Sequence, residues 1–139
     1  MSYNQFGRFT EDTDLAMKAA GLVAASANGS IVDLGEGLFD GFLVVDLTAV
    51  EVASGDEKYT ITVEGSTVAA MSSASVGLGS KVFGVATDPM DDNLTALGRY
   101  VIPFRNEENG EIQRYVRLRT VVAGTIATGI NYSAFLAKR

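Results

Sequence analysis

The sequence predicts an all-β protein, namely an antiparallel β-sandwich, a jelly-roll-like fold or a partly closed barrel with an extended N-terminal arm. Three segments near the C-terminus, residues 99–105, 115–122 and 126–136, alternate apolar and polar side chains with period 2. Alternation of this kind, rich in β-branched and aromatic residues, is typical of strands with one buried face. The 15 Gly residues of the 139-residue chain provide turn positions between such strands.

The three C-terminal segments are predicted to share one antiparallel sheet and one core face. A three-residue loop at 108–110 would place Ile102 opposite Val116, and its last residue is a glycine, which such loops need. A two-residue turn in the same place would instead set Arg105 opposite Arg114, and like charges directly opposite each other are unfavourable. We therefore expect the three-residue loop, with the third segment added through a similar turn.

The outward face of this predicted sheet is rich in arginine. Arginine and aromatic side chains are enriched at protein interfaces, so we take this Arg face as a candidate contact surface. The alternative is a solvated sheet face whose arginines pair with nearby acids. The residues of the predicted Arg face are Arg99, Arg105, Tyr115, Arg117 and Arg119.

The first 14 residues form the predicted N-terminal arm, and residues 15–139 form a single β domain. The arm is polar, with the isolated aromatic residues Tyr3, Phe6 and Phe9. Terminal segments of this composition are often loosely held. The alternative is an arm that a partner orders through its aromatic side chains.

The remaining segments are predicted in chain order from the same signals. Residues 15–27 are extended or mixed, and residues 31–34 are a short strand. A strand over 42–52 has apolar residues on both faces, which indicates a central position, and it is expected to form a hairpin with a strand over 59–64. A surface loop or edge segment at 66–80 precedes a short strand at 81–86. Residues 88–98 begin with Asp-Pro and end with Gly, which are typical helix start and stop signals. They predict a capped helical turn or an acidic loop rather than a metal site.

The composition excludes several kinds of chemistry. The chain has no His and no Cys, so it lacks the Ser-His-Asp triad, a cysteine nucleophile and thiolate metal sites. No carboxylate is placed by the sequence in an apolar pocket, as a general acid requires. We therefore expect no enzymatic activity and no cofactor or metal.

The net charge of −6 argues against nucleic acid as a partner, because phosphate binding needs a basic surface. The charge is uneven: residues 1–69 hold 11 acidic and 3 basic side chains, and residues 70–139 hold 6 and 8. This asymmetry either orients an assembly contact or reflects pairing between the two halves. Charged residues interrupt the N-terminus before any apolar run, so we expect no signal peptide, no membrane segment and synthesis in a cytoplasm.

The order of features resembles the small capsid cement, or decoration, proteins of tailed bacteriophages. The resemblance is carried by IVDLG (Ile31–Gly35), the apolar segments of Phe42–Glu64 and RYVRLRTVVAGTIATG (Arg114–Gly129). It extends over most of the region from Asp14 to Leu136, apart from Ser66–Gly98. It implies a β jelly-roll-like fold, a homotrimer, a virion location, and binding to the major capsid protein from outside the capsid. Catalysis and cofactors are not implied.

The alternative from another class is a ligand-binding β-sandwich such as a carbohydrate-binding module. Such modules stack sugars on exposed aromatic side chains. This chain has no Trp, and most of its Tyr and Phe residues fall on predicted core positions. We therefore expect the capsid-binding role, with contacts through the arm and the Arg face.

Overall fold

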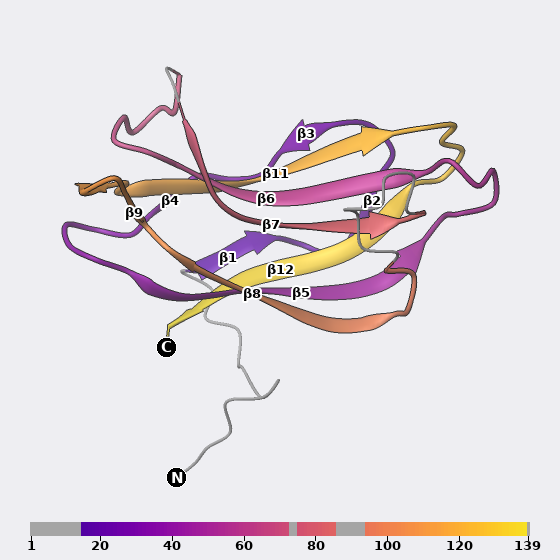
Figure 1. The fold of residues 1–139 in the computed structure, drawn as a ribbon, viewed down its shortest axis with the longest axis horizontal. Helices are drawn as coiled ribbons and strands as arrows, with labels where there is room; N and C mark the ends of the chain where they lie inside the picture. Colours follow the sequence, from indigo (N-terminus) through magenta and orange to yellow (C-terminus); the bar gives the residue numbers. More distant parts are fainter. Residues whose placement is uncertain (1–14, 73–74, 86–93, 139) are drawn as a thin grey trace, which may run out of the picture.

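The computed structural model describes residues 15–72, 75–85 and 94–138, which form two antiparallel sheets packed face to face (Figure 1). The first sheet has the order β1-β12-β5-β8, and β2 also pairs with β12. Its strands are β1 (Ala16–Lys18), β2 (Leu22–Val23), β5 (Asp40–Val50), β8 (Gly98–Arg105) and β12 (Ile130–Lys138).

The second sheet has the order β3-β11-β6-β7, and β4 also pairs with β11. A separate two-stranded hairpin, β9-β10, lies in the chain between β8 and β11. The predicted antiparallel β-sandwich is confirmed, and the sheets do not close into a barrel. These strands are β3 (Ala27–Asn28), β4 (Val32–Asp33), β6 (Lys58–Ser66), β7 (Val76–Gly84), β9 (Glu107–Glu108), β10 (Glu111–Ile112) and β11 (Tyr115–Ala123).

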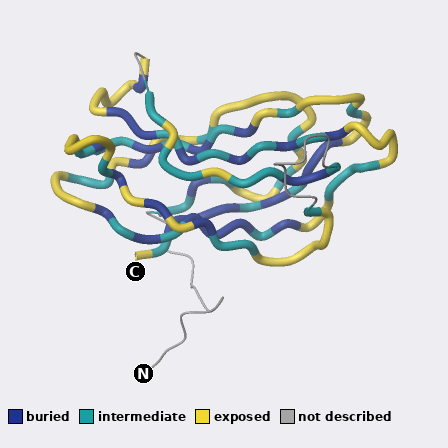
Figure 2. Tube along the Cα trace, in the orientation of Figure 1, coloured by how far each residue is buried: buried dark blue, intermediate teal, exposed yellow. Residues whose placement is uncertain are grey.

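The core lies between the two sheets, and along most of the long strands buried positions alternate with less buried ones (Figure 2). Leu43 and Val45 of β5, Ile61 of β6 and Leu118 of β11 are at most 1 % exposed. Tyr132 also belongs to this core; its hydroxyl is hydrogen-bonded to the Thr120 hydroxyl, and burial raises its pKa to about 12. The buried faces agree with those predicted from the alternation.

The predicted pairing of consecutive strands is wrong. Ile102 of β8 lies opposite Leu43 of β5, and Val116 of β11 lies opposite Gly65 of β6. The three C-terminal strands therefore do not share one sheet, and the strands over 42–52 and 59–64 do not form a hairpin. Segments 51–57 and 106–114 cross from one sheet to the other, so consecutive apolar faces meet across the core rather than side by side.

The turn at Asn109-Gly110 also differs from the prediction. Glu108 pairs with Glu111, which leaves a two-residue turn with φ of 53° at Asn109 and 84° at Gly110. Positive φ at both central residues suits the twist of a hairpin. The charge argument against this turn fails because the hairpin ends at Ile112, before Arg114 could face Arg105.

Other predictions have mixed outcomes. Strand β5 is central, as predicted, with β12 and β8 on its two sides. Strand β7 begins at Val76, five residues before the predicted strand, and forms an edge of its sheet. The predicted N-terminal arm lies outside the described residues, as does most of the predicted helical turn, and residues 94–97 are irregular.

Candidate interaction surface

The residues of the predicted Arg face lie on two opposite surfaces of the sandwich. Arg99 and Arg105 belong to β8 in the first sheet, whereas Tyr115, Arg117 and Arg119 belong to β11 in the second. Arg105, Arg117 and Arg119 each lie between two buried residues, and Arg99 and Tyr115 share the outward alternation of the same strands, so all five point away from the core as predicted. The predicted common face is nevertheless wrong, because the outward faces of two packed sheets point in opposite directions. Tyr3, Phe6 and Phe9 lie outside the described residues.

Three arginines are held by carboxylates of the first half of the chain. Arg99 binds Asp46 through two hydrogen bonds of 2.7 and 2.9 Å, and Arg117 binds Glu64 at 3.0 Å. Arg114 with Asp33 is the third pair. Together the three pairs link residues 99–117 to residues 33–64. The uneven charge of the two halves therefore corresponds to pairing between them within one molecule.

Arg105 and Arg119 are less tightly held. The Arg119 guanidinium donates to the Asn28 side-chain oxygen at 2.8 Å. Arg105 lies 3.8 Å from Glu107, and its side chain is 55 % exposed. Because a long, exposed ion pair contributes little to stability, Arg105 can exchange Glu107 for a partner's carboxylate at small cost.

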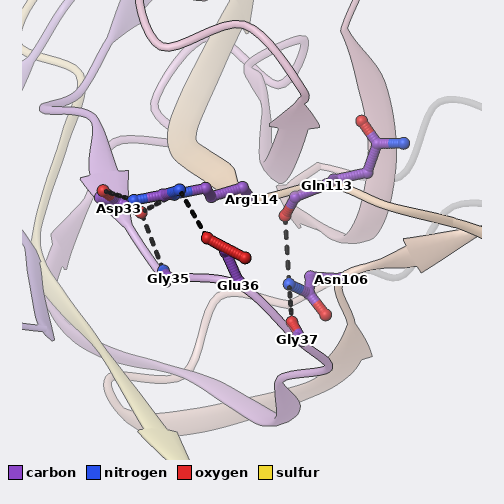
Figure 3. A network of polar contacts seen from close by, with 7 residues as sticks. All are labelled: Asp33, Gly35, Glu36, Gly37, Asn106, Gln113 and Arg114. Carbon is purple, nitrogen blue, oxygen red and sulfur yellow. Dashed lines mark hydrogen bonds and ion pairs between the residues drawn. The ribbon is translucent and has the colours of Figure 1, made fainter.

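A polar network near β9 and β10 holds the chain where it changes sheets (Figure 3). Asn106 is fully buried. Its side-chain oxygen accepts from the Phe39 amide at 2.7 Å, and its side-chain nitrogen donates to the carbonyls of Gln113 at 3.1 Å and Gly37 at 3.3 Å. One side chain thus joins the loop before β5 to the ends of β8 and β10.

Arg114 stabilises the same end of the sandwich, where residues 106–114 cross between the sheets. Its guanidinium binds Asp33 at 2.8 and 3.0 Å and lies 3.9 Å from Glu36 (Figure 3). Asp33 also accepts from the Gly35 amide at 2.8 Å. The hydrogen bond from Arg114, followed by that from Gly35, lowers the pKa of Asp33, so the pair is ionised at neutral pH. The loop of residues 34–39 is consequently fixed at both ends.

A groove of about 390 Å³ lies beside this junction, the crossing of residues 106–114 between the sheets. Its apolar lining comes from Leu78, Pro103 and Phe104, and the other lining residues are charged. An apolar surface framed by charges, on extended strands, suits a loop or peptide segment of another protein. The charged lining residues are Asp40, Arg105, Glu107 and Glu108.

Sequence reasoning identified Arg105 but missed the rest of the groove. The lining residues come from β5, β7, β8 and β9, and no periodic pattern links residues so far apart in the chain. The dense charge of residues 105–111 was the one available signal. Within the described ranges, no three His, Cys, Asp or Glu side chains are grouped to hold a metal ion.

The Glu51 carboxylate holds a neighbouring loop at the end of the sandwich where segment 51–57 connects β5 to β6. Glu51 accepts hydrogen bonds of 2.7–3.1 Å from the backbone amides of Ala127, Thr128 and Gly129. Gly129 has a φ of 97°, and a Cβ there would lie 2.2 Å from the Val23 carbonyl, so the loop can approach only through glycine. The hydrogen bond from Gly129, followed by that from Thr128, lowers the pKa of Glu51.

This arrangement predicts an acid-dependent loss of stability. Because the folded protein lowers the pKa of Glu51, the stability that Glu51 contributes is complete above the ordinary Glu pKa of about 4.3. It is lost as the pH falls through the lower, folded value. Glu51→Gln should lower the free energy of unfolding at pH 7 and make its decline on acidification shallower. Urea unfolding at several pH values checks this, and an unchanged slope in the variant would contradict it.

Comparison with known protein families found no family that matches this chain, and a search of curated proteins found no similar sequence. In the part of the chain that the structure describes, no helix has the length and apolar character of a membrane span.

Proposed function

We propose that the protein is a structural virion protein that binds the outside of a bacteriophage capsid and stabilises the lattice of its major capsid protein. The observation that carries this proposal is the groove beside β9, with its apolar lining and charged rim. The sequence resemblance to capsid decoration proteins supplies the class of partner. A loop of the capsid protein with apolar and charged residues would fit this groove.

The rigidity of the groove supports such a role. Asn106, Arg114 and their partners fix the segments around it through hydrogen bonds within the chain. A surface that is already ordered loses little conformational entropy when it binds. Arg105 provides the charge that a partner's carboxylate can engage.

In this proposal the protein acts as a homotrimer. Its N-terminal residues Tyr3, Phe6 and Phe9 provide a second contact with the lattice. Each groove contact is small and would be weak by itself. Linking several such contacts in one oligomer increases the overall affinity without any new contact. A trimer could therefore hold neighbouring capsid subunits together although each chain binds weakly.

The carbohydrate-binding alternative gains no support from the described side chains. Within residues 15–72, 75–85 and 94–138, each Phe and Tyr is buried or half-buried. An exposed aromatic platform for sugar stacking is thus absent from that part of the chain. A glycan array with the purified protein tests this alternative directly.

We expect Arg105→Glu to weaken attachment to capsids, because it removes a cation beside the groove and adds an anion near Glu107 and Glu108. The loss should be larger at low salt, where exposed charges are screened less. Co-sedimentation of the protein with purified phage capsids, at two salt concentrations, measures the effect.

Arg119→Glu is the matched control, because it makes the same charge change on the outer surface of the other sheet. Binding that is weakened by Arg119→Glu and not by Arg105→Glu would contradict the groove as the contact. A protein that sediments as a monomer at all concentrations, and that never pellets with capsids, would contradict the proposed function itself.

A further inference from the structure

The outward face of the sheet β1-β12-β5-β8 carries a compact group of apolar side chains. The strand register places Val44 between Phe135 and Val101, and Phe42 between Ala137 and Pro103. Side chains directly opposite each other on neighbouring strands are in contact range. We call this group the outer patch: Phe42, Val44, Val101, Pro103, Phe135 and Ala137.

The outer patch points away from the core. Its strand neighbours Leu43, Val45 and Ala134 belong to the core cluster between the sheets, whereas Val44 and Phe135 do not. Even so, Val44 is 0 % exposed and Phe135 is 3 % exposed. The described strands form only the two layers of the sandwich and place no third layer over this face (Figure 1).

One side of the patch is closed by an ion pair. The Arg99 guanidinium, bound to Asp46, lies 5.4 Å from the centre of the Phe135 ring. This contact places Arg99 over the Phe135 ring, and the row of Arg99 and Asp46 lies next to the row of Val44. Because Val44 is fully buried in a single chain, its cover must come from another part of the same molecule.

The chain enters this sheet beside the patch. Ala16 of β1 lies opposite Phe135, so the row of side chains from Val101 through Val44 and Phe135 ends at the point where residues 1–14 join the sheet. Fourteen residues reach at most about 45–50 Å when extended, and three neighbouring strands span only about 10 Å. The segment is therefore long enough to cross the patch, and it carries the apolar side chains of Phe6 and Phe9.

We propose that, in the free protein, residues 1–14 fold back over the outer patch of their own chain and cover it with Phe6 and Phe9. Burial of apolar surface on both sides drives this docking. The inference concerns the free protein and does not depend on the proposed capsid function. A second copy of the chain is the other occupant that the test must distinguish.

A single tryptophan reports whether the segment is docked. The chain has no Trp, so Phe9→Trp introduces one fluorophore into the full-length protein. We expect its emission at a shorter wavelength in the folded protein than in denaturant. Adding Pro103→Glu, at an exposed position of the patch, should move the emission to longer wavelength. Val121→Glu, on the outer surface of the other sheet, should leave it unchanged.

Emission at the denatured position in the folded protein would overturn the inference, as would an equal response to Pro103→Glu and Val121→Glu. Far-UV circular dichroism of each variant shows that the β structure is retained.

Crosslinking identifies which chain provides the cover. The chain also has no Cys, so the pair Phe6→Cys and Ser133→Cys places two unique thiols on the segment and beside the patch. A short bis-maleimide should join them within one chain, giving a crosslinked species of monomer mass. The control pair, Phe6→Cys with Val121→Cys, should react far less. Dimers from the first pair would assign the patch to a second copy and overturn the proposal, and so would equal reaction of the two pairs.

Discussion

Replacing Leu118 by alanine is expected to lower the free energy of unfolding by about 2–5 kcal/mol, because it leaves a cavity in a packed core. Leu118 is 1 % exposed and lies in the core cluster. It belongs to β11, which pairs with β6 on one side and with β3 and β4 on the other. Strands held on both sides cannot move inward to fill the space, so the cost should fall in the upper part of this range.

Val121→Ala is the matched control on the same strand. Val121 points outward and is 38 % exposed, so its truncation should change the unfolding free energy by no more than about 0.5 kcal/mol. Urea or guanidinium titrations of the two variants give both values. Equal losses would mean that the buried and exposed faces of β11 are assigned the wrong way round.

Asn106→Ala should also cost roughly 2–5 kcal/mol, since each buried polar group left without a partner costs about 1–3 kcal/mol. The variant deprives the Phe39 amide of its acceptor and the Gln113 carbonyl of a donor. It also removes the bond to the Gly37 carbonyl. The measurable result is a lower unfolding free energy together with faster hydrogen exchange at the Phe39 amide.

Asn28→Ala provides the comparison, because Asn28 is exposed and its side chain makes one described hydrogen bond, to Arg119. Its loss should cost less than about 1 kcal/mol. If the two variants were equally stable, or if exchange at Phe39 were unaffected by Asn106→Ala, the role of Asn106 at the junction would be refuted.

The alternation of side chains determined which face of each long strand is buried. Ile102, Val116 and Tyr132 were predicted to face the core, and each is at most 4 % exposed. The outward direction of Arg99 and Arg117 followed from the same pattern. Period 2 is a local property of an extended backbone, so it survives whatever sheet the strand joins.

Strand partners were decided only by the tertiary structure. The predicted hairpins assumed that consecutive strands pair, but segments 51–57 and 106–114 are long enough to cross the roughly 10 Å between packed sheets. Either arrangement buries the same apolar faces. The choice depends on junction contacts such as those of Asn106 and Glu51, whose partners are distant in the chain.

The candidate groove and the outer patch were decided in the same way. Arg105 was visible as an outward arginine, but Asp40, Leu78 and Glu107 join it only because β5, β7, β8 and β9 meet at one end. Val44 was recognised as an apolar residue on a strand with two apolar faces, and its burial beside Phe135 depends on the pairing of β5 with β12. The alternation with period 2 indicates the direction of each side chain but carries no information about its neighbours on other strands. The sequence therefore determined which face of each strand is buried, and the tertiary structure determined which residues come together in the groove and the outer patch.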